Sequence, residues 1–463
     1  MHIRPIPYRD LIAVSATFHN AAHFAFLDGA SGHDGNGRFS YLAADPFHLI
    51  TGTRDGLMVN GKKDPRDPFV CLQEELARYA EPPHDAPAPF NGGAIGYFGY
   101  ELAGRLERLP APRPDRLALP ECVFGFYDVI AAFDHQTRDA WIFSSGFPEG
   151  TSVLRKERAE KRAEVFAERI AQAPERSAPT DWKRRGVWRA ELSRAEVERR
   201  IARIIAYVEA GDIFQANFTQ RFLAERPEGL DDFTLYRRLR ELTPAPFATF
   251  LRAGTGLSLL GASPERFLLL NNGWARAEPI KGTRPRDADP LRDRALGAAL
   301  QESVKDRAEN LMIVDLMRND LSRVCEPGSV KVPQLCALES FASVHHLISA
   351  VTGYMRPGMG AVDLLRASFP GGSVTGAPKI RAMEIIHELE PAPRGAYCGC
   401  LGWIGFDGAM DMSMTIRTLT LTGDTVVAQA GGGIVADSQP AAEYEESMTK
   451  ITPLLKALAG GGP

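Results

Sequence analysis

The sequence lacks a long hydrophobic run. Across its 463 residues, no apolar stretch approaches the ~18 consecutive residues that a membrane-spanning helix requires. Residues 1–8 are followed by no uninterrupted apolar segment of the kind that a secretory signal contains. We therefore expect a protein of the cytoplasm that has no membrane partner.

The chain also has few cysteines and a small net charge. The six cysteines are scattered along the chain, and the one close pair, Cys398 and Cys400, is spaced too tightly for a Cys-x2-Cys zinc knuckle. We expect these cysteines to be free, reduced and buried. The formal net charge of −4 gives no overall attraction to nucleic acid, although a small anionic substrate can still bind where Arg and Lys gather.

The hydrophobic pattern predicts a mixed α+β protein. Short β-like runs broken by glycine and proline occupy roughly the first third of the chain, and long helices then alternate with glycine-punctuated strands. A capping box at Ser193 and Glu196 predicts the start of a helix that ends at Gly211. The predicted helices are 153–172, 293–320, 361–369, 378–389 and 440–459, and the predicted strands include 214–222, 257–260, 265–270, 400–406, 412–422 and 425–429.

A run rich in alanine and proline at residues 173–180 predicts a linker. The character of the sequence changes beyond it. We therefore divide the chain into a β-rich N-terminal region, residues 1–180, and a catalytic region, residues 181–463.

Two predicted helices carry carboxylates on one face. Glu309 is the last of three acidic residues that share a face of the helix over 293–320, and Glu446 belongs to a similar stripe that continues to Lys450. A solvated helix face explains either stripe taken alone. Residues 312–317, which follow Glu309, are apolar apart from Asp315, however, and carboxylates beside core residues favour a site for a hard cation such as Mg2+.

Two glycine-rich segments predict anion-binding backbone. Residues 370–379 precede a predicted helix, and residues 430–435 follow a predicted strand. The first segment is not a Walker loop, because it lacks Gly-Lys-Ser/Thr at the required spacing. Tight turns explain either segment equally well when it is taken alone.

Glu265 and Lys281 flank a predicted β-hairpin that turns at residues 271–273, Asn-Asn-Gly. The hairpin would bring these two side chains together. A lysine that loses solvent there becomes a better nucleophile because its pKa falls. For one lysine without this context, a surface role is the ordinary interpretation.

These segments, in this order, resemble those of the chorismate-utilising enzymes, a family that includes anthranilate, aminodeoxychorismate, isochorismate and salicylate synthases. The resemblance covers about residues 190–459 and is weaker before them. It implies the family's fold, in which large antiparallel β-sheets pack together with helices outside. The matching stretches are 211–217, 263–266, 279–286, 309–320, 372–379, 397–399, 416–418, 431–437 and 443–447.

The resemblance also implies a set of site residues. Glu309 and Glu446 would hold Mg2+, which binds the ring carboxylate of chorismate. Thr375 and Gly376 would line the ring, and His346 would lie near the ring carboxylate or the leaving hydroxyl. The residues implied at the enolpyruvyl carboxylate are Tyr397, Arg417, Gly432, Gly433 and Lys450.

Residue 281 separates activities within the family. Anthranilate synthases resemble this stretch but carry Ala there, whereas Lys is typical of many aminodeoxychorismate synthases. The resemblance therefore implies that Lys281 adds to chorismate C2 while Glu265 protonates the leaving C4 hydroxyl. Ammonia then gives 4-amino-4-deoxychorismate, for p-aminobenzoate and folate biosynthesis. Gln215, where relatives that use water tend to have lysine, points away from water as nucleophile.

The chain contains no Gly-x-Cys-x-Gly element of a glutaminase. We therefore expect ammonia from a separate glutamine amidotransferase subunit, in a heterodimer, or from solution. An anthranilate synthase large subunit is the nearest alternative. A non-catalytic regulatory subunit that binds chorismate or tryptophan, and an α+β binding protein with incidental carboxylate stripes, also remain open.

Overall fold

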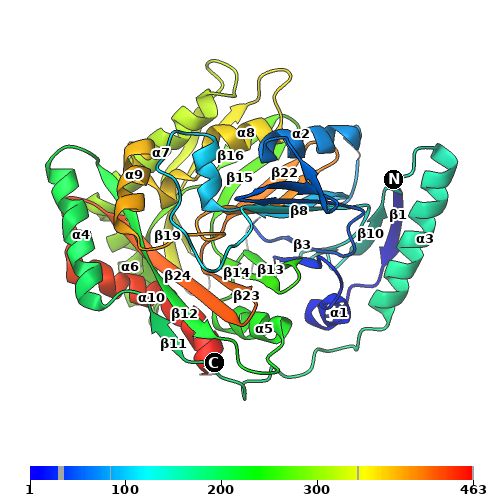
Figure 1. Cartoon of the computed structure of the whole chain (residues 1–463), viewed down its shortest axis with the longest axis horizontal. Helices are drawn as coiled ribbons and strands as arrows, with labels where there is room; N and C mark the ends of the chain where they lie inside the picture. Colours follow the sequence, from blue (N-terminus) through cyan, green and yellow to red (C-terminus); the bar gives the residue numbers. More distant parts are fainter. Residues whose placement is uncertain (30–35, 84, 341–343, 461–463) are drawn as a thin grey trace.

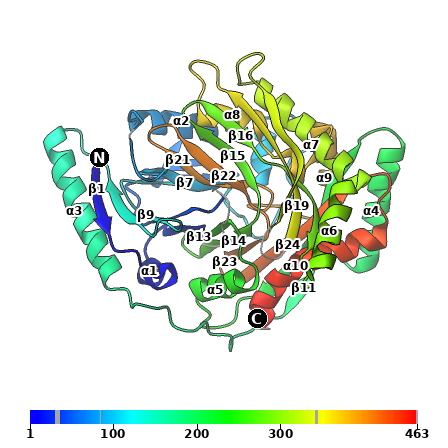
Figure 2. The same cartoon turned by 180° about the vertical axis from the view of Figure 1, so that it is seen from behind.

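Two antiparallel sheets of twelve strands each form the frame of the molecule, seen in the computed structural model of the chain (Figures 1 and 2). The structure describes residues 1–29, 36–83, 85–340 and 344–460. The first sheet consists of β1 (His2–Ile6), β10 (Ala140–Ser144), β9 (Val129–Asp134), β3 (Phe39–Ala43), β2 (Ala25–Asp28), β13 (Phe247–Gly254), β14 (Leu257–Ser263), β23 (Thr418–Thr422), β24 (Thr425–Ile434), β12 (Gln215–Glu225) and β11 (Trp188–Ala190), with β20 (Gly376–Ala377) beside β12.

The second sheet follows the same antiparallel pattern. Its order is β17 (Ile280–Pro285), β19 (Val344–Tyr354), β16 (Trp274–Ala277), β15 (Arg266–Asn271), β22 (Met410–Met414), β21 (Cys400–Gly405), β7 (Gly93–Phe98), β8 (Cys122–Tyr127), β4 (His48–Thr53), β5 (Gly56–Val59) and β6 (Lys62–Asp64), with β18 (Lys331–Ser340) beside β19. Both sheets contain strands from before and after residue 180.

Helices cover the outer faces of the sheets. α1 (Leu11–Phe18), α3 (Ser152–Ala171), α5 (Asp232–Leu242) and α10 (Pro440–Ala459) bury apolar side chains against the first sheet. α2 (Pro68–Arg78), α7 (Val304–Ser322) and α8 (Ala361–Ser368) do so against the second. A third apolar cluster, which includes Tyr41, Tyr97 and Trp403, lies between the sheets. The predicted architecture is therefore confirmed.

Several predicted elements match closely. α3, α8 and α10 lie where helices are predicted, as does α9 (Lys379–Leu389). α4 (Arg194–Glu209) begins with the predicted capping box of Ser193 and Glu196. All six cysteines are free and buried, as expected. Among the residues that the structure describes, no helix combines the length and the apolar character that crossing a bilayer requires.

The single helix predicted over 293–320 is wrong. The structure has two helices there, α6 (Pro290–Glu302) and α7. Ser303 interrupts them because its backbone is extended (φ −62°, ψ 109°) and its hydroxyl accepts a hydrogen bond from the Asp306 amide, which caps α7. Because of this break, α7 need not continue along the axis of α6.

The strand predicted over 412–422 is also wrong, because it spans two strands in different sheets. β22 belongs to the second sheet and β23 to the first. The chain crosses between them at Arg417, whose backbone is left-handed (φ 49°). Arg417 therefore lies in the short connection that leads from the second sheet to the first.

The sequence predicts that the glycine-rich segment 430–435 is a loop after a strand, but β24 continues to Ile434. Gly431 and Gly433 pair with Thr219 and Asn217 of β12. A Cβ added at Gly431 would lie 1.9 Å from the Phe218 carbonyl oxygen. The glycines therefore allow two strands to approach closely, rather than forming a free anion-binding loop.

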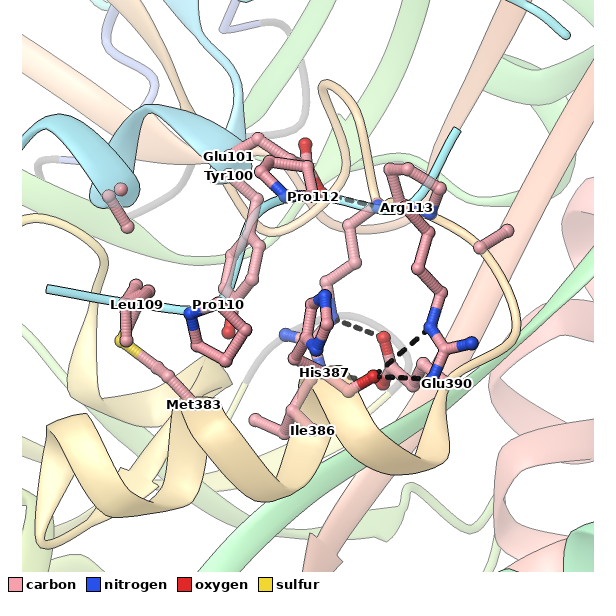
Figure 3. A pocket seen from close by; sticks show the side chains of 15 residues that line it. Tyr100, Glu101, Leu109, Pro110, Pro112, Arg113, Met383, Ile386, His387 and Glu390 are labelled. Atoms are coloured by element: carbon pink, nitrogen blue, oxygen red, sulfur yellow. Dashed lines mark hydrogen bonds and ion pairs between the residues drawn. The ribbon is translucent and has the colours of Figure 1, made fainter. Parts of the chain in front are cut away.

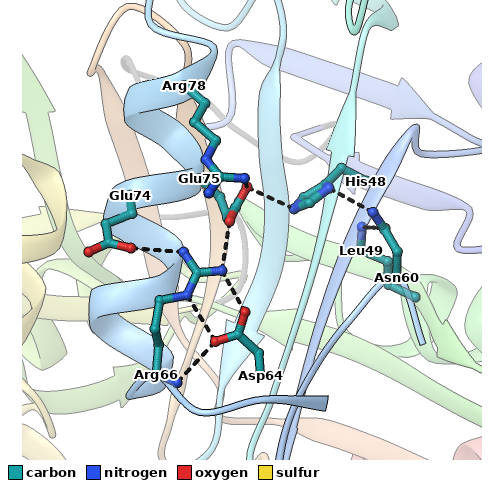
Figure 4. A network of polar contacts seen from close by, with 8 residues as sticks. All are labelled: His48, Leu49, Asn60, Asp64, Arg66, Glu74, Glu75 and Arg78. Atoms are coloured by element: carbon teal, nitrogen blue, oxygen red, sulfur yellow. Dashed lines mark hydrogen bonds and ion pairs between the residues drawn. The ribbon is translucent and has the colours of Figure 1, made fainter. Parts of the chain in front are cut away.

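A buried polar network fixes the N-terminal helix α2 to the second sheet (Figure 4). The Glu75 carboxylate on α2 receives Arg66 at 2.8 Å and Arg78 at 3.1 Å, and lies 3.3 Å from His48 Nε2 on β4. Arg66 also binds Asp64 at 2.7 Å, which holds the end of β6. A buried carboxylate needs such partners to offset its desolvation.

Substituting Gly431 tests the close approach of β24 and β12. We expect Gly431→Ala to lose at least about 2 kcal/mol of unfolding free energy, because the added methyl group meets backbone that cannot move aside. Gly432→Ala is the matched control, since its added Cβ would have no neighbour closer than 3.4 Å. Urea unfolding of both variants provides the measurement, and equal stability would contradict this account of the pairing.

Candidate active site

The predicted hairpin is present and brings Glu265 to Lys281. β15 and β16 pair antiparallel and turn at Asn272 and Gly273, which both have positive φ (48° and 74°). β16 and β17 pair with successive parts of β19. The start of β17, at Ile280, therefore lies beside Glu265. The Ile280 amide hydrogen-bonds the Glu265 carboxylate, and the charge of Lys281 acts on it.

Glu265 is buried, with 6% of its surface exposed. Desolvation raises the pKa of its carboxyl to about 7, although Ser373, Lys281 and the Ile280 amide act in the opposite direction. The carboxyl can therefore carry a proton near neutral pH, as a general acid must.

Lys281 lies in an environment that favours the neutral amine. Burial lowers the pKa of its ammonium group, against the opposing charges of Glu309 and Glu265, and Lys450 lowers it further. Its Nζ donates a hydrogen bond to the Ser373 carbonyl at 3.4 Å. This carbonyl belongs to η2 (Gly372–Val374), in the predicted glycine-rich segment 370–379.

Carboxylates from two helices gather beside Lys281. Burial raises the pKa of Glu309 on α7, and the charges of Lys281 and Lys305 partly offset this effect. Partial desolvation would raise the pKa of Glu446 on α10, whose side chain is 55% exposed, but Lys450, at 2.7 Å, Lys305 and Lys281 lower it overall. The charge of Lys281 therefore acts on both glutamates predicted as metal ligands.

Glu443, one turn before Glu446, is a site residue that the metal prediction left out. Its carboxylate accepts a hydrogen bond from Ser438 Oγ at 2.7 Å and lies 3.5 Å from Lys305 Nζ. A Cβ added at Gly432 would lie 3.4 Å from Glu443 and 3.9 Å from Glu446. The acidic stripe on the last predicted helix contained this signal, because both residues lie on one helix face.

The donor chemistry of this cluster suits a hard cation. Glu309, Glu443 and Glu446 supply carboxylate oxygens, the ligands that Mg2+ prefers, and few protein ligands suffice where the ion keeps its waters. Among the described residues, however, no three acidic, histidine or cysteine side chains converge as a ready-made metal cluster. The carboxylates pair instead with Lys305 and Lys450.

Arg417 and His346 form a second part of the site. Burial lowers the pKa of the Arg417 guanidinium, and among the described residues no carboxylate forms an ion pair with it. Burial, together with the charge of Arg417, lowers the pKa of His346 to about 4, so this imidazole is neutral at physiological pH. His346 Nδ1 lies 2.9 Å from Thr283 Oγ1 on β17. A largely desolvated cation that has no carboxylate partner among the described residues suits a bound carboxylate.

The remaining predicted residues are packed against neighbouring backbone and side chains and so help to hold the site in shape. Thr375 is fully buried and its hydroxyl donates to the Gly371 carbonyl at 3.0 Å. Gly376 (φ 145°) and Gly433 both lie directly against Gln215, where a Cβ would collide. Tyr397 is buried too, and desolvation raises the pKa of its phenol.

Arg394 is a structural support of the site that sequence reasoning missed. Its guanidinium, 2% exposed, donates to the carbonyls of Val374 at 2.8 Å and Asn217 at 2.6 Å, and binds the Glu390 carboxylate at 2.7 Å. Glu101 accepts hydrogen bonds from the Arg394 and Gly395 amides. A Glu–Arg pair spaced by four residues is an ordinary surface pattern, so nothing in the sequence indicated this burial.

A small pocket lies beside this support (Figure 3). Tyr100 and Glu101, from η1 (Tyr100–Arg105), form one wall, and Met383 and Ile386 of α9 form another. The Arg113 guanidinium closes the end of α9 by donating to the His387 carbonyl. None of the predicted site residues lines this pocket.

A larger cavity, of about 610 Å³, lies between the two sheets, and Lys281 is not among the residues that line it. Trp403 and Arg266 contribute to its walls, and the Arg266 guanidinium binds Asp411 at 2.9 Å and Glu278 at 2.7 Å. Arg266 follows Glu265 directly, and successive strand residues face opposite ways. The cavity that Arg266 lines and the site that contains Glu265 therefore lie on opposite faces of the second sheet.

The family described as chorismate binding enzyme matches residues 32–456 of this sequence. The chain belongs to this family. The family-level expectation is thus confirmed, and the chain is an enzyme of chorismate-utilising type.

Curated relatives include proteins of two activities. Aminodeoxychorismate synthase component 1 from Klebsiella aerogenes is 43% identical over 91% of this chain and 90% of the relative. Its counterpart from Escherichia coli K12 is 41% identical, with the same coverage. Anthranilate synthase component 1 from Streptomyces coelicolor is also 41% identical, over 85% of this chain and 77% of the relative. Overall identity therefore does not separate the two activities.

Solved structures agree on the fold. Anthranilate synthase component I from Streptococcus pneumoniae superposes with a TM-score of 0.81 at 33% identity, covering 93% of this chain and 94% of that one. The menaquinone-specific isochorismate synthase from Escherichia coli gives a TM-score of 0.75 at 16% identity, covering 99% and 94%. The second likeness shows the fold alone.

The raised pKa of Glu265 predicts a pH-dependent stability. Its folded-state pKa of about 7 lies above the ordinary 4.5, so its contribution is fully present at low pH and is lost as the pH rises through about 7. Between pH values below 4.5 and above 7, the wild type should lose roughly 3 kcal/mol of unfolding free energy relative to Glu265→Gln. Urea unfolding across this range tests the effect, and a difference independent of pH would contradict it.

Proposed function

We propose that this chain aminates chorismate at C4 to give 4-amino-4-deoxychorismate, a precursor of p-aminobenzoate and folate. The observation that carries the proposal is the pairing of Lys281, whose pKa is lowered, with Glu265, whose pKa is raised to about 7. A lowered pKa makes the Lys281 amine easier to deprotonate and so a better nucleophile, while the Glu265 carboxyl can carry a proton near neutral pH beside it. The relatives named aminodeoxychorismate synthase component 1 support this choice.

The first step is a displacement by Lys281. The Nζ lone pair adds to ring C2, the ring double bond shifts, and the C4–O bond breaks. Glu265 donates its proton to the departing oxygen, which leaves as water. The result is a covalent adduct through a secondary ammonium at C2, with Glu265 ionised beside it. Burial favours this step because it disfavours the charged form of both reactant groups.

The second step reverses the displacement with a different nucleophile. Ammonia attacks C4, the double bond shifts back, and the C2–N bond breaks to release Lys281 as the neutral amine. The Glu265 carboxylate takes a proton from the new C4 ammonium and returns to its acid form. The enolpyruvyl group stays in place, so no pyruvate is released.

The other site residues would position the substrate. Arg417 offers a planar fork to the enolpyruvyl carboxylate, supported by Lys450 and the backbone at Gly432. His346, which is neutral, can hydrogen-bond near the ring carboxylate or the C4 hydroxyl. Bound Mg2+ would offset the charge of the ring carboxylate. In this proposal its protein ligands are Glu309 and Glu446.

The remaining roles in this proposal fall to four predicted residues. Thr375 and Gly376 would line the ring through their backbone, since the Thr375 hydroxyl already donates to the Gly371 carbonyl. Tyr397 and Gly433 would border the enolpyruvyl group.

Ammonia, rather than water, fits the residue at position 215. Gln215 is fully buried, and neither its side-chain oxygen nor its nitrogen has a hydrogen-bond partner among the described residues. An amide cannot deprotonate water as a lysine amine can. It can, however, accept a hydrogen bond from ammonia, which needs no base to become nucleophilic.

Ammonia would come from a partner protein. The relatives are named as components, and this chain has no glutaminase nucleophile element. We therefore propose a heterodimer with a glutamine amidotransferase subunit. The same arrangement would serve an anthranilate synthase, the second candidate, which the relative from Streptomyces coelicolor favours. Lys281 decides between them, because anthranilate synthases that resemble this stretch carry Ala there.

Product analysis separates the two candidates. With chorismate, Mg2+ and an ammonium salt, the purified chain should form 4-amino-4-deoxychorismate without pyruvate. Chromatography of the products, with a coupled pyruvate assay, provides the measurement. Anthranilate and pyruvate as the main products would refute the proposed reaction while leaving family membership intact.

Lys281→Ala and Lys281→Met should lower the rate of this reaction by about three orders of magnitude or more, because no other amine replaces the nucleophile. Chorismate binding, followed by calorimetry, should persist in both variants, since Arg417 and the carboxylates remain. Methionine keeps most of the side-chain volume and so controls for packing. Substantial aminating activity in either variant would exclude Lys281 as the nucleophile.

A further inference from the structure

The ammonium group of Lys305 lies between two carboxylates of the candidate metal site. Its Nζ is 3.5 Å from Glu443 Oε1 on α10 and 4.0 Å from Glu309 Oε1 on α7. Partial burial lowers the pKa of Lys305, but Glu443, Glu309 and Glu446 raise it overall. Lys305 is therefore a charged bridge between the two helices that carry the carboxylates.

Lys450 occupies a different position. It binds Glu446 within the same helix at 2.7 Å and also donates to the Gly431 carbonyl at 3.2 Å, so the strand β24 holds it in place. Lys305 has no comparable anchor among the described residues. It lies in the first turn of α7, and 46% of its side chain is exposed. A long, half-exposed lysine can rotate its charge into solvent at little cost.

A divalent cation and Lys305 would compete for the Glu309 carboxylate, and Lys305 also contacts Glu443 beside it. A cation drawn to Glu309 approaches the carboxylates that Lys305 contacts, and like charges a few ångströms apart repel strongly where water is partly excluded. Chorismate carries two carboxylates, so the metal and the substrate together add no net charge. The electrostatic cost of binding the metal therefore falls when the substrate binds with it.

We propose that Lys305 is an internal counter-ion that the divalent cation displaces, which keeps metal binding weak until chorismate is present. This inference rests on the proposed function, because it takes the carboxylates as the metal site. Lys305 is a positioning residue in this account, since it acts on the cation through Glu309 and Glu443 and does not touch the reacting atoms. The order in which the ligands bind follows from it: substrate with metal, rather than metal alone.

The test measures binding of Mn2+, as a probe for the divalent site, by the loss of the free-ion signal in electron paramagnetic resonance. Titrations of the whole chain run without ammonia, with and without chorismate. Lys305→Met removes the charge, and Lys305→Arg keeps it. Lys161→Met is the matched control, because it removes the same charge from an exposed position on α3, on the far side of the molecule from α7 and α10 (Figure 1).

Without chorismate, Lys305→Met should bind Mn2+ about tenfold more tightly than the wild type, or tighter still. Lys305→Arg and Lys161→Met should match the wild type. The gain in Mn2+ affinity on adding chorismate should shrink in Lys305→Met. A thermal melt of each variant checks that the fold is retained.

Equal or weaker Mn2+ binding by Lys305→Met, with chorismate-dependent binding intact in the wild type, would overturn the inference and leave the proposed function standing. Tighter binding by Lys305→Arg as well would overturn it too, because charge would not then be the cause. No binding by the wild type, with or without chorismate, would instead overturn the proposed metal site, and the inference with it.

Discussion

Desolvation of two ionisable groups at one point, where the chain enters β15 and β17 begins, is the constraint on which the rest of the site depends. Glu265 and Lys281 lie in surroundings that disfavour charge on either of them. Their mutual attraction favours the ion pair, but burial outweighs it for both groups. The hairpin, the edge of β19 and the Ser373 carbonyl together create this environment, so the chemistry rests on local packing rather than on a single catalytic loop.

Glu265 and Lys281 belong to the second sheet and its connections. The groups beside them come from β24 and β12 of the first sheet and from α10. β24 carries Gly432, and α10, which follows it, carries Glu443 and Glu446. β12 lies against β24 through glycines that leave no room for side chains. Arg394 joins β12 to the loop that contacts Lys281. Movement in any of these supports would change the distance between the acidic cluster and the nucleophile.

Much of this arrangement could be predicted from local patterns. The Asn-Gly turn fixed the hairpin, the capping box marked α4, and the acidic stripes marked the faces of α7 and α10. Two of the errors arose where tertiary contacts decide: the 412–422 run changes sheets at Arg417, and the glycines of β24 pair with a strand more than 200 residues away in sequence. The third is local, because Ser303 breaks a helical pattern by capping α7. The buried Arg394 pair had no sequence signature at all.

The central claim is that Lys281 forms a covalent bond with the substrate. Incubating the chain with chorismate and Mg2+ but no ammonia, followed by an acid quench and peptide mass spectrometry, tests it directly. The account predicts an added mass of chorismate less one water on the peptide that contains Lys281, and none of this adduct in Lys281→Ala. An enzyme that turns over when ammonia is added, yet never carries that mass on Lys281, would contradict it.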